Sequence, residues 1–226
     1  MNYSVIVLAA GQGKRMECGY NKQLIKLAGT PLIVHSLRAF HDDPRCAEIV
    51  LVVSEPEKRE MEALVKEYAI QRVTRIVIGG VERQNSVYAG LQQVSAAEII
   101  LIHDGARPFV RKRVVHALAD AAREHGAAIA AVQVKDTVKE VEQMTIQKTV
   151  DRSKLWAAQT PQAFQKDLIC KAHEEAASEK IIGTDDASLV ERQGKLVAIV
   201  QSDYTNIKLT TQEDVLFAEA ILQQRS

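Results

Sequence analysis

The sequence predicts an α/β fold, in which helices flank a mostly parallel β-sheet and a β-arm projects from it. Apolar runs typical of buried strands alternate five times with helical periodicity over residues 5–132. This alternation calls for a parallel sheet covered by helices on both faces. It stops at residues 133–158, where two strand-like segments surround a polar middle. We therefore expect one Rossmann-like domain, 1–226, with an arm at about 133–158.

Along the first half of the chain, each strand is followed by a helix. The apolar run at residues 5–8 suits a strand buried on both faces, although its periodicity alone leaves a buried helix open. Thr30 and Pro31 predict a helix start, with threonine as N-cap and proline at the first helical position. Ser54 and Glu57 have the spacing of a capping box. Further strands are expected at 48–53, 72–78, 99–102 and 127–132, and helices at 32–40, 61–68, 86–94 and 114–125.

The second half begins with the predicted arm. Its limbs, 133–142 and 145–155, have little to bury against each other, and isolated hairpins are marginal in water. We infer that the arm packs on another subunit; the alternative is a hairpin that lies back on its own sheet. Residues 184–186 predict a helix cap rather than a ligand. Helices are expected at 166–179, 184–192 and 212–223, and strands at 196–200 and 207–209.

Three loops, at residues 9–22, 79–86 and 104–108, follow the ends of predicted strands. Ligands of parallel α/β folds bind beyond the carboxyl ends of the strands. We therefore expect these loops to converge on one edge of the sheet and to form a binding site there.

The first of these loops has the composition of a polyphosphate cradle. Gly11 and Gly13 let the backbone approach a ligand closely, and Arg15 and Lys22 supply positive charge. The loop is not a P-loop, because Arg15 stands where Ser or Thr is needed. It also lacks the third glycine and the acidic residue of the dinucleotide fingerprint. The alternative is an ordinary strand-to-helix turn with solvated cations.

Composition narrows the class of protein. The 226 residues carry a formal net charge of zero, which argues against a general nucleic-acid binder. No apolar run approaches the roughly 20 residues that a membrane span requires, and we see no secretory signal. Cys18, Cys46 and Cys170 are odd in number and widely spaced, which favours a reduced, cytoplasmic protein. The histidines lack the spacing of a zinc site.

Several motifs follow one another in a recognisable order. The chain reads LAAG-x-G-x-R-M with KQ at 22–23, then GGVERQNSV (79–87), HDGARP (103–108), KDTVK (135–139), VDRSKLW (150–156), QTPQAF (159–164), TDDAS (184–188) and NIKLTTQED (206–214). In this order and spacing the chain resembles the 2-C-methyl-D-erythritol 4-phosphate cytidylyltransferases of the non-mevalonate isoprenoid pathway. The resemblance covers essentially the whole chain. It implies transfer of the cytidylyl group of CTP to methylerythritol phosphate, a Mg²⁺ cofactor, and a homodimer with exchanged arms.

The resemblance also implies roles for residues of the three loops. Arg15 and Lys22 match the cations that stabilise charge at the α-phosphorus, and Arg107 matches a contact to the acceptor phosphate. Asp104 matches a substrate-binding residue that also binds Mg²⁺, a cation that prefers carboxylate oxygens and phosphates. The positions that match the nucleotide-binding residues are Ala9, Ala10, Gly11, Gly13, Gly80 and Ser86.

A second group of residues matches the acceptor site. Arg152 and Lys208 match the catalytic pair that positions methylerythritol phosphate, and family geometry brings Arg152 and Thr137 from the neighbouring subunit. The chain departs from the family pattern at Asn21, where proline is frequent, and at Val81, where aspartate is frequent. The first departure loosens the loop before Lys22, and the second removes any contact that the aspartate side chain makes.

The implied reaction needs no general base. A phosphate monoester has a second pKa near 6, so the nucleophile is largely ionised at neutral pH. The obstacle is repulsion between two anions, and the hypothesis therefore requires cations at several separated positions. Alternative functions are a ribitol 5-phosphate cytidylyltransferase, a non-catalytic nucleotide sensor on the same fold and, more distantly, a nicotinamide oxidoreductase.

Overall fold

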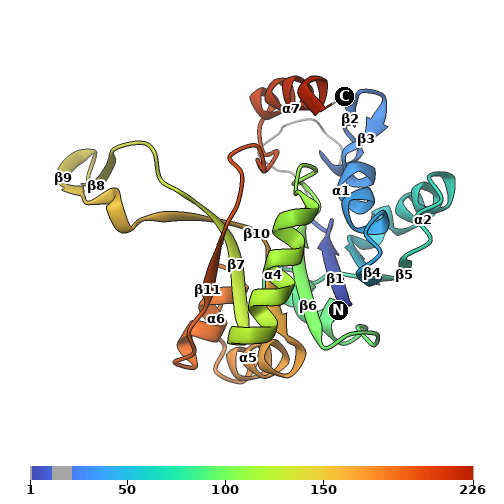
Figure 1. Ribbon diagram of the computed structural model, residues 1–226, viewed down its shortest axis with the longest axis horizontal. Helices are drawn as coiled ribbons and strands as arrows, with labels where there is room; N and C mark the ends of the chain where they lie inside the picture. Colours follow the sequence, from blue (N-terminus) through green and yellow to red (C-terminus); the bar gives the residue numbers. More distant parts are fainter. Residues whose placement is uncertain (1, 12–21, 226) are drawn as a thin grey trace.

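A seven-stranded sheet forms the centre of the computed structural model, which describes residues 2–11 and 22–225 (Figure 1). The strand order is β11-β7-β10-β6-β1-β4-β5. Neighbouring strands pair in parallel except at β10, which runs antiparallel to both β6 and β7. The mostly parallel sheet is therefore confirmed. Its strands are β1 (Tyr3–Leu8), β4 (Cys46–Val53), β5 (Val73–Ile78), β6 (Ile99–Asp104), β7 (Ala127–Gln133), β10 (Trp156–Gln165) and β11 (Ala198–Gln201).

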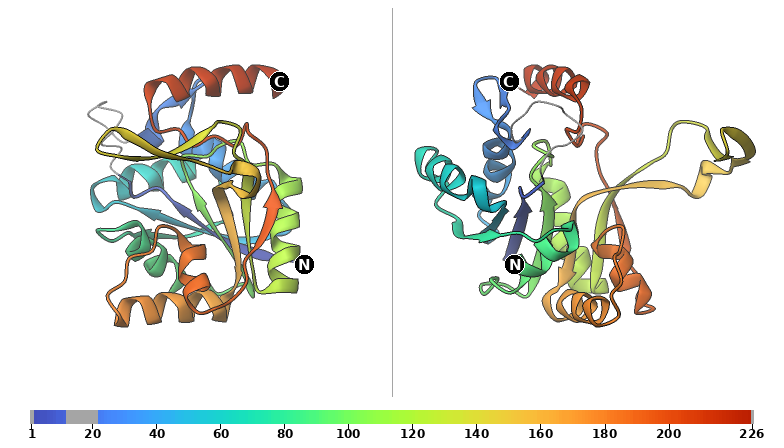
Figure 2. Two further views of the ribbon diagram at one scale, coloured as in Figure 1. Left: turned by 90° about the vertical axis from the view of Figure 1, so that its left-hand side faces the viewer. Right: turned by 180° about the vertical axis from the view of Figure 1, so that it is seen from behind.

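Helices cover both faces of this sheet, as Figures 1 and 2 show. Side chains of α1, α2 and α4 share one apolar core with Val5 and Val7 of β1, whereas those of α3, α5 and α6 share a second core with Ile6. All three β1 side chains are fully buried, which explains why this strand is continuously apolar. These helices are α1 (Leu32–His41), α2 (Lys58–Glu67), α3 (Arg83–Leu91), α4 (Lys112–His125), α5 (Lys166–Ser178) and α6 (Asp186–Arg192).

A third, smaller core lies where the last helix, α7 (Gln212–Arg225), meets the short segments that precede α1 (Figure 1). Ala218 of α7 is buried together with Leu27, Phe109 and Leu209. This packing holds the segment before α7 against the loop that follows β6. Three short elements precede α1 in this region: η2 (Lys22–Leu24), β2 (Lys26–Leu27) and β3 (Thr30–Pro31).

Two predicted helix starts are wrong in detail. Thr30 and Pro31 pair with β2 as strand β3, and α1 begins one residue later with Pro31 as N-cap. The apolar stripe predicted for that helix is confirmed, because Ile33, Leu37 and Phe40 are buried. Ser54 precedes a short 3₁₀ turn, η3 (Glu55–Glu57), and makes no side-chain cap to its backbone.

Two errors concern strands. Strand β10, which carries the QTPQAF motif, was not expected, and it inserts between β6 and β7. Conversely, the short strand expected at 207–209 does not form. There the backbone is irregular, and the Leu209 amide donates a hydrogen bond to the Ala106 carbonyl at 2.9 Å.

The predicted arm forms a hairpin that extends away from the sheet (Figures 1 and 2). Strands β8 (Val138–Glu142) and β9 (Thr145–Val150) pair antiparallel. Gln143 and Met144 connect them with positive φ angles of 47° and 62°, as a two-residue hairpin turn of the primed type requires. Apolar side chains stand out from the arm, with 51% of Val141, 96% of Met144 and 59% of Ile146 exposed.

Two further sequence expectations concern membranes and cysteines. Within residues 2–11 and 22–225, no helix combines the length and apolar character needed to cross a bilayer. Cys46 and Cys170 are free thiols, and Cys18 lies outside the described residues.

Candidate functional site

Backbone hydrogen bonds bring the three predicted loops to one edge of the sheet. The amides of Ala9 and Gly79 donate to carbonyl oxygens of β4 at 2.7 and 2.8 Å, and the Gly105 amide donates to the Leu8 carbonyl at 2.9 Å. The start of each loop is thus tied to the end of a neighbouring parallel strand, and residues 12–21 of the first loop lie outside the described residues. The predicted convergence at the carboxyl edge is confirmed.

The glycine pair at the end of β5 lies directly against the end of β1. A Cβ atom on Gly79 would stand 2.6 Å from Ser86 Oγ and 2.8 Å from Ala10 Cβ, so only glycine fits there. The Gly80 amide donates to Ser86 Oγ at 3.2 Å, and this hydroxyl donates to the Glu82 carbonyl at 3.2 Å. Ser86 therefore sets the turn that leads into α3. The structure brings together three of the predicted nucleotide-binding residues: Ala10, Gly80 and Ser86.

The predicted phosphate cradle is described only in part. Ala9 is buried, Ala10 is half-buried and Gly11 is exposed at the end of the described segment. Gly13 and Arg15 lie outside the described residues. Lys22 is described: its ammonium group donates to the Leu209 carbonyl at 3.2 Å, which places it beside the segment that carries Lys208.

Asp104, at the end of β6, has three cationic side chains around its carboxylate. Lys208 Nζ lies 2.7 Å from Oδ2, Arg83 Nε lies 3.5 Å from Oδ1, and Arg107 Nε lies 3.9 Å from Oδ2. Only 12% of the Asp104 side chain is exposed. The structure therefore brings Lys208, about a hundred residues further along the sequence, into one charged cluster with Asp104 and Arg107.

This cluster keeps Asp104 ionised. Burial alone would raise the pKa of the carboxyl group, but the positive charges of Lys208 and Arg83 outweigh it and lower the pKa well below its ordinary value. The carboxylate therefore needs no deprotonation near neutral pH before it can bind a divalent cation.

Arg83 is a member of this charged cluster that the sequence analysis did not single out. Its Nη1 atom lies 2.8 Å from Asp186 Oδ2, and Asp186 Oδ1 lies 3.1 Å from His173 Nε2. Arg83 thus bridges Asp104 and a buried carboxylate of α6. The motif GGVERQNSV contains Arg83, but the sequence gives no sign of these contacts. The partner residue, Asp186, can be recognised only in the folded chain, where α6 packs beside α3 and α5. Asp185 caps α6 through Ser188, which confirms the predicted helix cap.

The irregular segment before α7 is held in the site by specific hydrogen bonds. Arg107 Nη1 donates to the Asn206 carbonyl at 2.7 Å. The Asn206 side chain donates to Gln159 Oε1 at 2.9 Å and to the Thr160 carbonyl at 3.0 Å. These bonds replace the strand pairing expected at 207–209, and they place Lys208 over Asp104.

A buried hydrogen-bond chain orients the Asp104 backbone. The Asp104 amide donates to Thr160 Oγ1 at 3.0 Å, and Thr160 Oγ1 lies 3.2 Å from His103 Nδ1. On the other side of the ring, His103 Nε2 lies 3.0 Å from the Arg107 carbonyl. Burial lowers the pKa of His103 to about 4, so its ring is neutral and connects both ends of the Asp104–Arg107 turn.

The two arm residues lie apart from this cluster. Thr137 and Arg152 are both exposed, at the base of the β8–β9 hairpin, and Arg152 donates a hydrogen bond to the Lys135 carbonyl. In the part of the chain that the structure describes, no contact joins either of them to Asp104. The role of Thr137 and Arg152 in the acceptor site therefore stays a prediction.

A glycine segment at the carboxyl edge of a parallel sheet, beside a carboxylate surrounded by cations, is typical of a nucleotide-binding α/β protein. The family model for IspD, 2-C-methyl-D-erythritol 4-phosphate cytidylyltransferase, matches residues 3–224. The chain therefore belongs to this cytidylyltransferase family. The resemblance inferred from the motif order is confirmed.

Individual relatives agree with this assignment. The 2-C-methyl-D-erythritol 4-phosphate cytidylyltransferase of Shouchella clausii is 63% identical over 225 residues, which cover 100% of this chain and 98% of that protein. The crystal structure of 4-diphosphocytidyl-2C-methyl-D-erythritol synthase from Anaerococcus prevotii has a TM-score of 0.86 at 33% identity, covering 98% of this chain and 96% of that chain. A Thermus thermophilus structure of the cytidylyltransferase has a TM-score of 0.81 at 31% identity, covering 99% and 100%.

Proposed function

We propose that the chain transfers the cytidylyl group of CTP to 2-C-methyl-D-erythritol 4-phosphate and releases pyrophosphate. In this reaction the acceptor phosphate attacks the α-phosphorus in line. Family membership supports the reaction, and the cluster of Lys208, Arg83 and Arg107 around Asp104 is the observation that carries its mechanism.

The main barrier to this reaction is electrostatic. Two unit charges ~4 Å apart repel each other by about 4 kcal/mol at an effective dielectric of 20, and the attacking phosphate meets a triphosphate. Fixed cations lower this barrier without reorganisation at the moment of reaction. We assign Lys22 and Arg15 to the α-phosphorus and Arg107 and Lys208 to the acceptor phosphate. Lys22 and Lys208 occupy neighbouring segments, which supports such a division.

The nucleotide is assigned to the glycine segments. Ala9, Ala10, Gly11 and Gly13 would cradle the phosphates through backbone amides. Gly80 and Ser86 would recognise cytosine, because backbone amides and carbonyls beside a glycine pair can reach its N3 and its amino group. A Cβ atom on Gly79 would collide with Ser86 and Ala10, so this glycine lets the turn pack against the end of β1.

The family implies a divalent cation, and the described residues fit Mg²⁺. Mg²⁺ in phosphoryl-transfer sites uses one or two carboxylates plus substrate phosphates rather than a complete protein cage. Asp104 offers one ionised carboxylate. Among residues 2–11 and 22–225, no group of three His, Cys, Asp or Glu side chains could form such a cage. Asp104 would hold the cation, which when bound would neutralise phosphate charge.

The arm supports a proposed homodimer. Exposed Val141, Met144 and Ile146 would be covered by a second subunit, and Thr137 and Arg152 would reach the acceptor site of that subunit. Arg152 would then act with Lys208 on methylerythritol phosphate. We also predict that the chain folds as one domain, resides in the cytoplasm and has no nucleic-acid or membrane partner.

The direct test is turnover with defined substrates. Incubation with CTP, methylerythritol phosphate and Mg²⁺ should release pyrophosphate and form 4-diphosphocytidyl-2-C-methyl-D-erythritol. The value of kcat/KM should be higher for methylerythritol phosphate than for ribitol 5-phosphate; the reverse order would assign the chain to the second acceptor. Tight CTP binding without turnover on either acceptor would instead identify a nucleotide sensor.

A further inference from the structure

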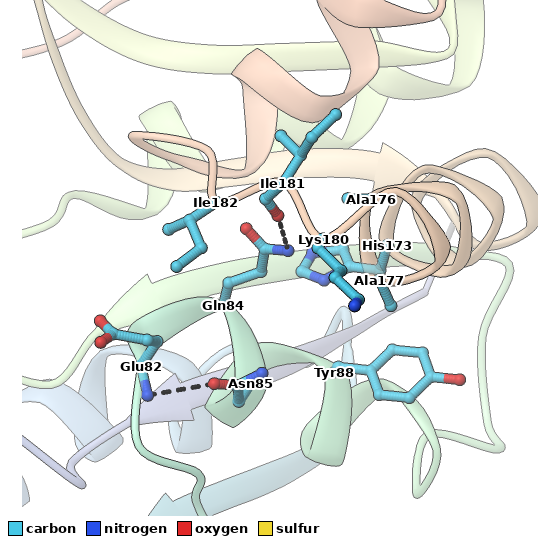
Figure 3. Close-up of a pocket in the computed structure, with 10 residues that line it drawn as sticks. All are labelled: Glu82, Gln84, Asn85, Tyr88, His173, Ala176, Ala177, Lys180, Ile181 and Ile182. Atoms are coloured by element: carbon cyan, nitrogen blue, oxygen red, sulfur yellow. Dashed lines mark hydrogen bonds between the residues drawn. The ribbon is translucent and has the colours of Figure 1, made fainter.

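Two hollow regions of the surface are held in different ways. The first, of about 310 Å³, lies between α3 and the C-terminal end of α5 (Figure 3). There the Gln84 side chain donates to the Ile181 carbonyl at 3.0 Å and accepts from the Gly183 amide at 2.9 Å, so its walls are tied together. The second, of about 340 Å³, lies where the arm leaves the sheet. Its walls belong to the two limbs of the arm: Gln133, Val134, Lys135, Arg152 and Ser153.

The two limbs separate around this second hollow. Sheet pairing ends where Gln133 lies opposite Trp156, and pairing resumes in the hairpin from Val138 onward. Between these points, residues 135–137 and 151–154, all of which the structure describes, form no strand pairs. A two-stranded hairpin is only marginally stable on its own. The direction of the arm therefore depends on what holds its base.

Tyr204, which follows β11, contacts this base from outside the arm. Its hydroxyl donates to the Gln133 carbonyl at 2.9 Å, and the Lys135 ammonium group lies 3.4 Å from the centre of its ring. The second contact is a cation–π interaction with the first part of the separated limb. The Lys135 carbonyl accepts a hydrogen bond from Arg152 of the other limb. Tyr204 is thus connected to both limbs of the arm.

The segment that carries Tyr204 is itself held by the sheet. On one side, the Ser202 amide donates to the Ala131 carbonyl of β7 at 2.9 Å. On the other side, the buried Asn206 is bonded to β10 through its side-chain amide. Because its backbone is fixed at both ends, Tyr204 can hold the arm in one direction relative to the sheet.

We propose that Tyr204 is a positioning residue for cytidylyl transfer, because its contacts set the direction in which the arm leaves the sheet. Thr137 and Arg152 lie close to the contacted residues. The same contacts therefore decide where these two side chains reach the acceptor site of the second subunit. The inference rests on the proposed exchange of arms.

Loss of Tyr204 should act on the acceptor and not on the nucleotide. Without this support the arm samples several directions, and the acceptor binds the fraction of molecules in which the arm points correctly. The apparent affinity for the acceptor falls in proportion to that fraction, whereas bound acceptor selects the correct direction. The KM for methylerythritol phosphate should therefore rise, with little change in kcat or in the dissociation constant of CTP.

Three variants separate the two contacts. Tyr204→Phe loses the hydroxyl donor, and Lys135→Met loses the charge over the ring. Each should raise the KM for methylerythritol phosphate about threefold, the scale of one hydrogen bond or one exposed cation–π contact. Tyr204→Leu loses both contacts and should raise this KM about tenfold. Since 46% of Tyr204 is exposed, all three variants should fold.

A matched control is available on α1. Arg38 Cζ lies 5.6 Å from the centre of the Tyr68 ring, so Arg38→Met also removes an exposed cation from a tyrosine ring. This pair lies outside the arm, and its loss should leave the KM for methylerythritol phosphate unchanged.

Hydrogen exchange measured by mass spectrometry tests the hold on the arm without substrate. Amides of residues 134–155 should exchange faster in Tyr204→Leu than in the wild type, whereas amides of β1 and β4 should be unchanged. This measurement needs neither turnover nor arm exchange. A protein that failed to transfer cytidylyl groups would still reveal whether Tyr204 holds the arm.

An unchanged KM in Tyr204→Leu would overturn the proposal, as would unchanged hydrogen exchange in the arm. A rise in KM accompanied by equally weakened CTP binding, or by faster exchange of β1, would also overturn it. A general loss of stability, rather than the direction of the arm, would then be the cause.

Discussion

The edge of the sheet around Asp104 and the β8–β9 arm hold their charged side chains in different ways. At the edge, Arg83, Arg107 and Lys208 surround one carboxylate that is 12% exposed. On the arm, Lys148 pairs with Glu140 at 2.8 Å, but the side chains are 64% and 56% exposed. Exposed pairs contribute little to stability because water and salt screen them. Of these two regions, the edge is therefore the one whose charged side chains are held in a defined arrangement within a single chain.

This difference teaches that one part of the proposed active site has its geometry set within a single chain, whereas the other part does not. The part around Asp104, Arg107 and Lys208 is braced by hydrogen bonds within the chain. The rest of the proposed acceptor site would come from Arg152 and Thr137, whose surroundings a second subunit would complete. Substitutions in the two regions should then behave differently, in size and in whether another subunit can compensate.

The largest expected effect is at the edge. Lys22→Ala should lower kcat about 10²–10³-fold, because a contact to charge that develops in the transition state is lost. CTP affinity should change far less. Steady-state kinetics together with CTP titration measure both quantities. Lys26→Ala removes an exposed lysine of β2 four residues away and serves as the control. A Lys22 effect confined to KM would contradict this role.

The arm allows a complementation experiment. Arg152→Ala should be nearly inactive alone, and so should Lys22→Ala. In a statistical mixture, half of the dimers carry one substitution in each subunit and regain one intact site, so about a quarter of wild-type activity should return. Activity assays on co-expressed or refolded mixtures measure it. A mixture no more active than its two components would show that the arms are not exchanged.

A smaller effect on catalysis is expected at Asp186, which pairs with Arg83 beside the sheet edge. Asp186→Asn removes the charge that holds Arg83 against Asp104, and should lower kcat/KM about tenfold, the scale of one charged hydrogen bond. The loss should fall mainly on kcat, since Asp186 touches no substrate group. Asp120→Asn breaks the exposed pair with Arg45 and should leave kinetics unchanged. Equal losses of kcat/KM in the two variants would mean that the Asp186 charge does not position Arg83.

The last prediction concerns stability and pH rather than catalysis. Burial lowers the pKa of His103 to about 4 in the folded chain, against 6.5 ordinarily. The unfolded chain thus binds more protons between these values, and the free energy of unfolding should fall as pH drops from 6.5 to about 4, by on the order of 3 kcal/mol in total. Urea denaturation at several pH values measures this slope. His103→Gln keeps a donor and an acceptor without titrating and should flatten it; an unchanged slope would exclude His103 as the source.

The comparison also shows where sequence reasoning works. The strands of the parallel half and their helices were predictable, because continuous apolar runs and helical stripes reflect burial directly. The position of the glycine pair and Asp104 at the carboxyl edge of the sheet was predictable, since the sequence places them at strand ends. The arm was predictable because the alternation of strands and helices stops at residues 133–158, although the surface that the arm would pack against was not predictable.

Strand β10 shows where such reasoning fails. Gln159, Thr160 and Gln162 are buried in it, so hydrophobic periodicity gives no strand signal. Their burial is tolerated because each finds a partner elsewhere in the chain. Gln162, for example, donates to Asp185 Oδ2 at 2.6 Å and accepts from the Ala187 amide at 3.1 Å. Those partners follow in sequence by more than twenty residues, and only the folded chain brings them together.

By itself, the sequence determined the alternation of strands and helices, the glycine turns and the presence of cations near strand ends, because these depend on local backbone preference and on periodic burial. The tertiary structure decided which charges meet: Arg83 with Asp186, Lys208 with Asp104, and the antiparallel β10 beside them. Charge pairing has no sequence period. It depends on distances between groups far apart in the chain, and those distances exist only after the apolar cores have packed.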